Sequence, residues 1–282
     1  MDYLQSAIAA AVLILLYVRM IKRELPAPIG SKQAVIPVLL GFLSVFVSTL
    51  FVFGFGIMMH DSGHSLGDIA NPAARSLIGA FLFAGFTEEI AKFLMMLLSF
   101  KLFRPKNVYE YILIGAGVGI GFTVNEEFLY GGNGINVLRL ISVAMHTAFG
   151  IVMARYLGLA ACKRLSGESS VGKEYALALF IPMLLHTLYD ACTAFNPVLA
   201  NAANEIDTTA AVWLSSAGAA VLAGIVWQIA VLVKLKKRAE DYSVMKTAAE
   251  SETPQESAAG SEASAESATP SVAAAENNQI TQ

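Results

Sequence analysis

The feature that most constrains this chain is a series of apolar stretches, each about 18 to 26 residues long, separated by short polar or basic joints. A helix of about 20 apolar residues spans the hydrocarbon core of a bilayer. Charged residues make up 15% of the chain, whereas soluble domains contain about a quarter. We therefore expect an all-α, polytopic transmembrane helix bundle with about seven spans. The predicted spans are residues 4–20, 34–59, 76–100, 109–130, 135–161, 175–195 and 208–233.

The distribution of lysine and arginine predicts the orientation, because cytoplasmic loops are enriched in both. Basic residues follow the first, third, fifth and seventh predicted spans, while the other joints are mainly acidic. We therefore expect the N-terminus to lie outside. The residues assigned to the cytoplasmic side are Lys22, Arg23, Lys32, Lys101, Arg104, Lys106, Lys163, Arg164, Lys173, Lys234, Lys236, Lys237 and Arg238.

The composition changes after the last predicted span. Residues 247–282 are mainly Ala, Ser, Glu, Thr and Pro, and such a segment cannot bury enough apolar surface to fold. We expect a transmembrane helical domain at residues 1–240 and a disordered cytoplasmic tail at residues 247–282. A formal net charge of −3 gives no sign of nucleic-acid binding. The expected surroundings are therefore the lipid bilayer.

The third predicted span contains three charged residues near its middle, Glu88, Glu89 and Lys92. One charge at the bilayer centre costs about 2.5–3.5 kcal/mol on insertion scales, so these side chains should face the protein interior. Glu88 and Lys92 share a helix face and can pair, while Glu89 is offset by about 100°. Such a pair leaves one carboxylate less compensated, which favours a functional site over a structural ion-pair cluster.

Three other predicted spans carry ionisable residues at comparable depth. A rise of about 1.5 Å per residue places Glu88, His146 and His186 roughly 15–18 Å below the outer ends of their spans. The same rise places Glu126 and Asp190 closer to the outer ends of theirs. His186 and Asp190 are four residues apart, so the carboxylate can orient the imidazole. We predict that four helices contribute to one polar site in the outer-to-middle layer.

These residues form four motifs whose order resembles that of the PrsW intramembrane proteases. That family is related to the CAAX prenyl protease group and to a scaffold subunit of γ-secretase. The resemblance covers about residues 81–190. The matching residues are Glu88, Glu89 and Lys92 for E-E-x-x-K, Phe122 and Glu126 for F-x-x-x-E-N, His146 for a histidine motif, and His186 and Asp190 for an H-x-x-x-D-like element.

One position departs from the family pattern, because Glu127 stands where the family usually has Asn. The departure puts in doubt the hydrogen bond that this Asn makes, and Asn125 is the candidate to replace it. We expect Glu127 to reach the outer interface rather than to take part in catalysis. The resemblance also implies that Lys92 neutralises Glu89.

The resemblance implies peptide hydrolysis without a covalent intermediate. Glu88 would be the general base, with His146 or Glu126 positioning the water. His186 and Asp190 would lie on the side of the oxyanion. The implied substrates are membrane-anchored proteins, notably single-span anti-sigma factors cut during regulated proteolysis. The implied location is the cytoplasmic membrane of a bacterium.

The same residues also allow a metal site. Two histidines and a carboxylate, here His146, His186 and Glu88, form a legitimate set of catalytic zinc ligands with one position left for water. The usual H-E-x-x-H motif is absent from the sequence. We therefore favour metal-free glutamate chemistry with no required cofactor, and keep a divalent metal such as zinc as the alternative.

Two other classes of function remain open. Intramembrane Glu, His, Asp and Lys also build proton relays, so a proton-coupled transporter is one alternative, although no repeated halves are found. A non-catalytic membrane scaffold is the other. Intact Glu88, His146 and His186 argue against lost catalysis.

Two further patterns receive a structural interpretation. Four glycines alternate across residues 115–121, but no Lys-Ser/Thr pair follows them, so a phosphate loop is not expected. Small residues four apart favour close helix packing instead. His60 and His64 lie in a predicted outer loop with Gly and Ser, and we assign no metal site there.

Overall fold

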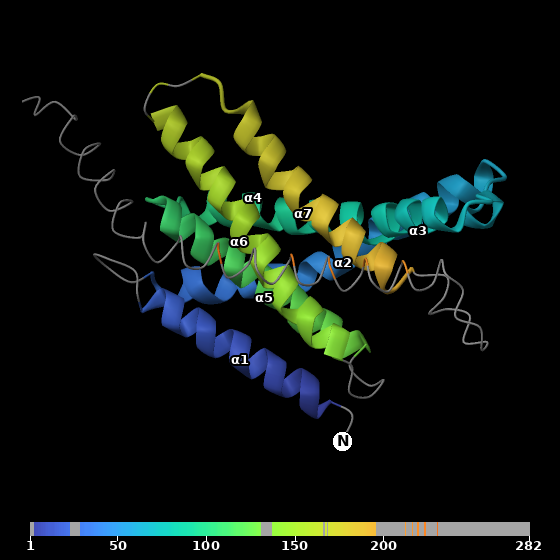
Figure 1. The fold of residues 1–282 in the computed structure, drawn as a ribbon. Coiled ribbons are helices and arrows are strands. Elements are labelled where there is room, and N and C mark those ends of the chain that lie inside the picture. Colours follow the sequence, from blue (N-terminus) through green and yellow to red (C-terminus); the bar gives the residue numbers. More distant parts are fainter. Residues whose placement is uncertain are drawn as a thin grey trace, which may run out of the picture.

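The structure, a computed structural model, describes residues 3–22, 29–130, 137–165, 167 and 169–195, together with single positions at 212, 216, 219, 223 and 230. Within these residues all regular structure is helical, as predicted (Figure 1). The predicted span at 208–233, apart from those single positions, and the predicted tail at 247–282 lie outside the described residues. The elements are α1 (Leu4–Ile21), α2 (Ser31–Asp61), η1 (Leu66–Asp68), α3 (Pro72–Ala80), η2 (Phe81–Gly85), α4 (Phe86–Phe103), α5 (Val108–Tyr130), α6 (Val137–Leu165) and α7 (Gly172–Cys192).

Four of the described helical segments are long and apolar enough to cross a membrane: α2, α5, α7 and Val143–Leu165 within α6. The apolar part of α1, Ser6–Ile21, is shorter. The third predicted span is divided among α3, the π-helix η2 and α4. Charged residues are frequent in α4, which lowers its hydropathy. The described residues thus support four spans by length and composition.

The central element is α5, which packs most extensively against α6 and α2. Its alternating glycines make this contact close. A Cβ atom at Gly119 would lie 2.6 Å from the His146 carbonyl oxygen on α6, and one at Gly121 would overlap the Val38 carbonyl on α2. Real side chains do not fit at such distances, so the prediction that these glycines serve helix packing is confirmed.

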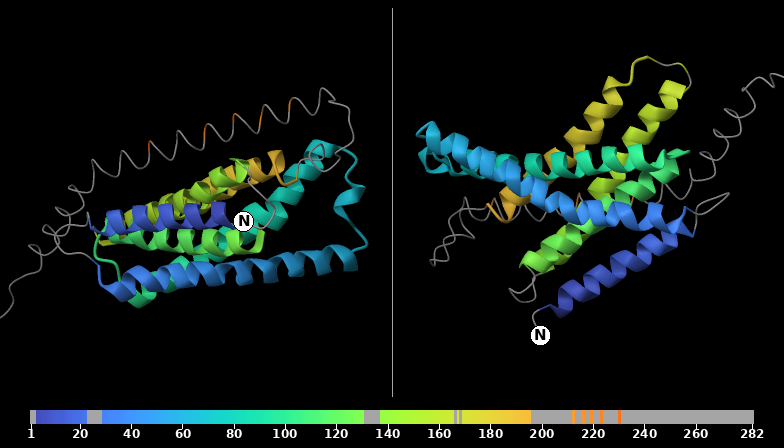
Figure 2. Two further views of the ribbon diagram at one scale, coloured as in Figure 1. Left: turned by 90° about the horizontal axis from the view of Figure 1, so that it is seen from below. Right: turned by 180° about the vertical axis from the view of Figure 1, so that it is seen from behind.

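Helix α1 lies along α5 (Figure 2) and is held near both ends by hydrogen bonds. Ser6 Oγ donates to Glu127 Oε2 at 2.6 Å. At the other end, Tyr109 Oη donates to the Met20 carbonyl at 2.9 Å. These bonds join the first apolar helix to the helix that carries Glu126.

The prediction that Glu127 reaches the outer interface is wrong. Its exposed fraction is 4%, because α1 covers this turn of α5 and Ser6 supplies a hydrogen-bond donor. Asn125 does not turn toward the predicted site either. Its Nδ2 donates to the Phe42 carbonyl on α2 at 2.7 Å, so it serves the contact between α5 and α2.

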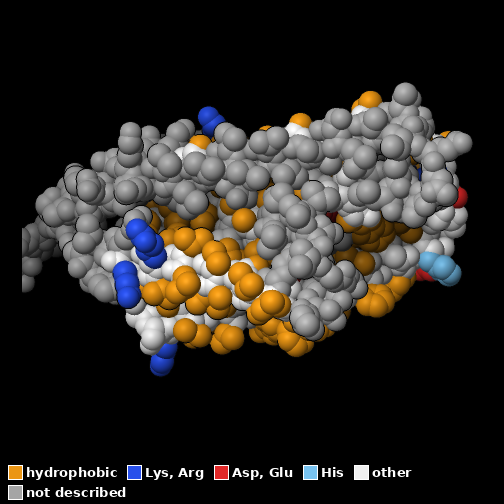
Figure 3. All heavy atoms as spheres, turned by 60° about the horizontal axis from the view of Figure 1, so that its bottom comes forward, with side chains coloured by type: hydrophobic (Ala, Val, Ile, Leu, Met, Phe, Trp, Pro, Cys, Tyr) orange, Lys and Arg blue, Asp and Glu red, His pale blue; other side chains and the backbone are white. Residues whose placement is uncertain are grey.

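The surface of the described residues carries many large apolar side chains. On α1 and α2, for example, Leu15, Leu50 and Phe53 are 65–70% exposed. In the view of Figure 3, apolar side chains fill the middle of the molecule, Lys and Arg gather near one end, and Asp, Glu and His are seen near the other. Apolar side chains on the outside are typical of a protein whose helices face lipid.

Candidate active site

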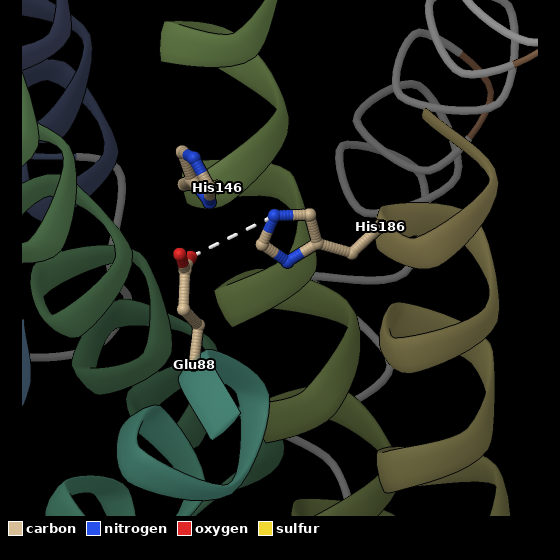
Figure 4. A group of neighbouring side chains, drawn as sticks. All are labelled: Glu88, His146 and His186. Carbon is tan, nitrogen blue, oxygen red and sulfur yellow. Dashed lines mark ion pairs between the residues drawn. The ribbon is translucent and has the colours of Figure 1, made fainter. Parts of the chain in front are cut away.

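The structure brings all seven predicted site residues into one cluster from four helices. They are Glu88, Glu89 and Lys92 on α4, Glu126 on α5, His146 on α6, and His186 and Asp190 on α7. Figure 4 shows Glu88, His146 and His186 pointing toward one another from three helices. The glycines of α5 allow α6 to approach closely, and His146 lies at this close contact between the two helices.

Lys92 lies at the centre of the cluster and is fully buried. Its Nζ lies 2.8 Å from Glu89 Oε1 and 3.7 Å from Glu88 Oε2. The closer ion pair is therefore with Glu89, although Glu88 shares its helix face. The ammonium also lies 3.7 Å from the centre of the Phe122 ring, a cation–π contact that strengthens when water is excluded.

His186 contacts the three carboxylates around it. Its Nδ1 lies 2.8 Å from Glu89 Oε1, while its Nε2 lies 3.3 Å from Asp190 Oδ2 and 3.6 Å from Glu88 Oε2. When Nδ1 donates to Glu89, it fixes the orientation of the ring and leaves Nε2 facing Glu88. Glu89 is thereby a structural partner of both Lys92 and His186.

His146 is held at both ring nitrogens. Its Nδ1 lies 2.9 Å from Lys92 Nζ, and its Nε2 lies 2.7 Å from Glu126 Oε2. An ammonium can only donate, so Nδ1 accepts from Lys92 and Nε2 donates to Glu126. The four residues Glu89, Lys92, His146 and Glu126 thus form a continuous chain of charge-assisted contacts.

Exposure divides the cluster into a closed side and an accessible side. The side chains of Glu89 and Lys92 are 0% exposed, whereas those of Glu88, Glu126 and Asp190 are 16–24% exposed. Buried oxygens without a hydrogen-bond partner in the described part of the chain include Glu88 Oε2 and Glu89 Oε2. Buried polar atoms normally have partners, so Glu88 Oε2 is suited to receive a water or another ligand.

The donor set also fits a metal ion. One ligand atom from each of Glu88, His146 and His186 lies within 4.8 Å of the other two. Glu88 Oε2 has no hydrogen-bond partner among the described residues, and two imidazoles with a carboxylate suit zinc. Holding an ion through His146 requires exchanging one of the two contacts of its ring. Among the described residues, His60 and His64 do not join such a group, and the side chain of His60 is 88% exposed.

Two features of the site are not predicted from the sequence. The aromatic contact of Phe122 with Lys92 is one, although Phe122 stands in a recognised motif. The other is the π-helix η2, which begins at Phe81 and ends three residues before Glu88. A π-helix has no simple sequence signal, but glycine at its end is a hint of close backbone contact.

Residues 32–232 match the family described as PrsW family intramembrane metalloprotease. Among curated relatives, Protease PrsW of Halalkalibacterium halodurans is 33% identical over 159 residues, which cover 54% of this chain and 70% of the relative. Protease PrsW of Bacillus subtilis is 35% identical over 125 residues, which cover 43% of this chain and 56% of the relative. The chain therefore spans little more than half the length of the latter. No solved structure matches this chain significantly. The family predicted from the four motifs is confirmed, and the chain belongs to the PrsW family of intramembrane metalloproteases.

Proposed function

We propose that this protein is an intramembrane endopeptidase that cuts membrane-anchored proteins in regulated proteolysis. Single-span membrane proteins, such as anti-sigma factors, are the proposed substrates, and the bacterial cytoplasmic membrane is the proposed location. The proposal rests on the convergence of Glu88, His146 and His186 from three helices. One ligand atom of each residue lies within 4.8 Å of those of the other two. Relatives named as proteases support the reaction class.

Glu88 is the proposed general base. Its Oε2 is buried without a hydrogen-bond partner among the described residues, whereas the side chain as a whole is 19% exposed, so the residue lies at the border of the accessible side. A carboxylate in a poorly hydrated site can take a proton from that water and later give it to the leaving amine. The positive charge of Lys92 offsets the negative charge of Glu89 beside it. Glu88 is held by two longer ion-pair contacts, with Lys92 at 3.7 Å and with His186 at 3.6 Å.

The two histidines hold the reacting groups in position. His146 is held by Lys92 and Glu126 at its two ring nitrogens, so it orients the water beside Glu88 by exchanging one of these two contacts. His186 donates Nδ1–H to Glu89, and in its doubly protonated form it also presents an Nε2–H to the place where charge develops on the substrate carbonyl oxygen. If a divalent ion is held by Glu88, His146 and His186, it supplies Lewis acidity toward water and carbonyl. Metal-free and metal-dependent hydrolysis thus use the same side chains.

The proposed topology has about seven spans with the N-terminus outside, a helical domain at residues 1–240 and a disordered cytoplasmic tail at residues 247–282. The apolar helices support a membrane location. The basic joints after the first, third, fifth and seventh proposed spans support the orientation. In this topology the site lies in the outer half of the bilayer, which favours cleavage near the outer end of a substrate helix.

The proposal is tested by purifying the wild type, Glu88→Gln and Glu110→Gln in detergent and following cleavage of candidate single-span substrates. Glu110 is a matched control because it accepts from the Lys106 backbone N–H at 2.8 Å, about 24 Å along α5 from Glu126. We expect the wild type and Glu110→Gln to cut, and Glu88→Gln to be inactive although folded.

Two other results contradict the proposal. Equal cleavage by all three proteins shows that Glu88 is not the base. Absence of cleavage by the wild type with every substrate moves the transporter and scaffold alternatives ahead, and proton-driven uptake would then identify a transporter. A strong chelator added to the active wild type separates the two chemistries. Loss of cleavage with recovery on zinc addition indicates metal dependence, and unchanged cleavage indicates metal-free hydrolysis.

A further inference from the structure

The backbone changes its helical form directly before the catalytic carboxylates. The π-helix η2 follows α3 without a break and ends at Gly85, and the backbone N–H of Phe86 donates to the Phe81 carbonyl. The bond spans five residues instead of four, which changes the direction in which the following side chains point. Glu88 and Glu89 lie in the first turn of the α-helix that begins after this change.

Gly85 is in close contact with α7. A Cβ atom at this position would overlap Thr187 Oγ1 and would lie 3.0 Å from the Met183 carbonyl oxygen and 3.1 Å from the Thr187 backbone nitrogen. Two of these three atoms belong to the backbone and cannot rotate away. Gly85 is buried, and the exposed fraction of Thr187 is 7%. A side chain at residue 85 would therefore require the Thr187 hydroxyl to move and the two backbones to separate by a few tenths of an ångström.

The same crossing of helices carries polar contacts of the site. Thr187 directly follows His186, whose Nδ1 lies 2.8 Å from Glu89 Oε1 and whose Nε2 lies 3.6 Å from Glu88 Oε2. The contact with Glu89 is a hydrogen bond and the contact with Glu88 is an ion pair, and both weaken as the heavy atoms move apart. Moving η2 and α7 apart by a few tenths of an ångström at Gly85 would therefore also lengthen the distances from His186 to Glu88 and Glu89.

Thr187 does not hold the helices together through its hydroxyl. Oγ1 of Thr187 is buried and has no hydrogen-bond partner in the described ranges. The contact with Gly85 is thus one of shape, in which the bare glycine backbone receives the threonine side chain. This makes Thr187 a suitable position for a compensating change.

We propose that Gly85 is a positioning residue of the active site. Its lack of a side chain lets η2 lie against Thr187, and this contact sets the distance of His186 from Glu88 and Glu89. The inference rests on the proposed function of those residues. Gly85 has no side chain and would act in the reaction only by setting how closely η2 and α7 cross next to the site.

The test compares Gly85→Ala, Gly85→Ala/Thr187→Ala and Gly54→Ala in the cleavage assay. Alanine has the higher helix propensity, so a loss in Gly85→Ala arises from contact with α7. Gly54 on α2 is the matched control because a Cβ there meets nothing within 4 Å. We expect kcat of Gly85→Ala to fall roughly 10- to 100-fold with KM little changed, since small misplacements of reacting groups have effects of this size. The double variant should recover part of the loss, and Gly54→Ala should match the wild type.

A second readout does not depend on catalysis. The chain has only four histidines, and His60→Gln with His64→Gln leaves the two site imidazoles for ¹⁵N NMR. Gly85→Ala should shift the His186 ring signals away from those of the wild type, and Thr187→Ala should return them toward it. If Gly85→Ala does not fold, Thr187→Val, which places a larger methyl against Gly85, should give a smaller loss of kcat and a smaller shift.

Several results would overturn the inference. One is a Gly85→Ala protein with the kcat of the wild type and unchanged His186 signals. If Gly85→Ala does not fold, the same result in Thr187→Val would overturn the inference. Another is a loss in Gly85→Ala that the Thr187→Ala change does not reduce. If the wild type itself cuts no substrate, the proposed function fails, while the NMR signals still decide whether Gly85 positions His186.

Discussion

Lys92 is central to the charge balance of the candidate active site. It is the cation that contacts Glu88 and Glu89, and it also donates to His146 and lies against Phe122. A buried charge that loses its partner is strongly destabilising, because the protein interior does not replace the lost water. The ammonium is therefore expected to matter for folding as well as for catalysis.

Replacing Lys92 with Met should lower the free energy of unfolding by about 3–5 kcal/mol, the usual effect of removing one partner of a buried pair. Thermal unfolding in detergent measures the change. Lys163→Met is the control, since Lys163 is 39% exposed and pairs with Glu174 at 2.9 Å. Exposed pairs contribute about 0–1 kcal/mol. Equal effects of the two substitutions would show that Lys92 is not a buried structural charge.

The sequence identifies the ionisable residues of the site but not their partners. Glu88, His146 and His186 could be found because charged and polar residues are rare in apolar helices and their depths agree. The preference of Lys92 for Glu89 over Glu88 could not be read from helix periodicity, which places Glu88 and Lys92 on one face. Side-chain rotamers and contacts from α6 and α7 decide that choice.

At the scale of the helices, glycines set how closely the bundle packs. On α2, Gly41 lies against the Val118 backbone of α5, so that a Cβ at Gly41 would overlap the Val118 carbonyl. The same helix contains Gly54, where a Cβ meets nothing within 4 Å. Two glycines of one helix thus have different roles.

Gly41→Ala should destabilise the protein by about 1–3 kcal/mol, the usual effect of overpacking a close contact. Gly54→Ala should leave stability unchanged or slightly raised, because alanine favours the helix. Unfolding temperatures of the two variants in the same detergent provide the comparison. A loss of stability in both, or in neither, would contradict the close contact between α2 and α5.

The contact of α1 with α5 is tested at Ser6 and Glu127. Removing the Ser6 hydroxyl withdraws a donor from a buried carboxylate, which costs about 1–3 kcal/mol. Ser6→Ala should therefore destabilise the protein, whereas Ser6→Ala combined with Glu127→Leu should be no worse than Glu127→Leu alone. Strictly additive losses in denaturation experiments would show that the two side chains are not coupled.

Element boundaries follow from hydropathy where the helices are regular. The predicted spans at 34–59 and 109–130 agree closely with α2 (Ser31–Asp61) and α5 (Val108–Tyr130). The span predicted at 76–100 is instead divided into α3, η2 and α4. Hydropathy cannot reveal a π-helix, because the sequence FLFAG is as apolar as a regular helical turn. The burial of Glu127 was missed for a similar reason, since the packing of α1 over α5 is a tertiary contact.

On the face shown in Figure 3, the described Lys and Arg side chains lie mainly toward one end and the Asp, Glu and His side chains toward the other. In the proposed topology the basic end is cytoplasmic, and the loop with His64 lies outside. Single cysteines at His64 and Lys106, both exposed positions, test this in a background without Cys162 and Cys192. A membrane-impermeant maleimide should label His64→Cys in intact cells and Lys106→Cys only after permeabilisation. The opposite labelling pattern would invert the topology.

We propose that Glu88 and His186, brought together from α4 and α7, act as one catalytic unit. The most direct measurement is kcat/KM for the wild type, Glu88→Gln, His186→Gln and the double variant on one single-span substrate. Residues that act as a unit give grossly non-additive losses. We predict that each single variant loses nearly all activity and that the double variant is no worse. Losses that multiply, or a Glu88→Gln protein that cuts like the wild type, would show that the two residues do not act as one catalytic unit.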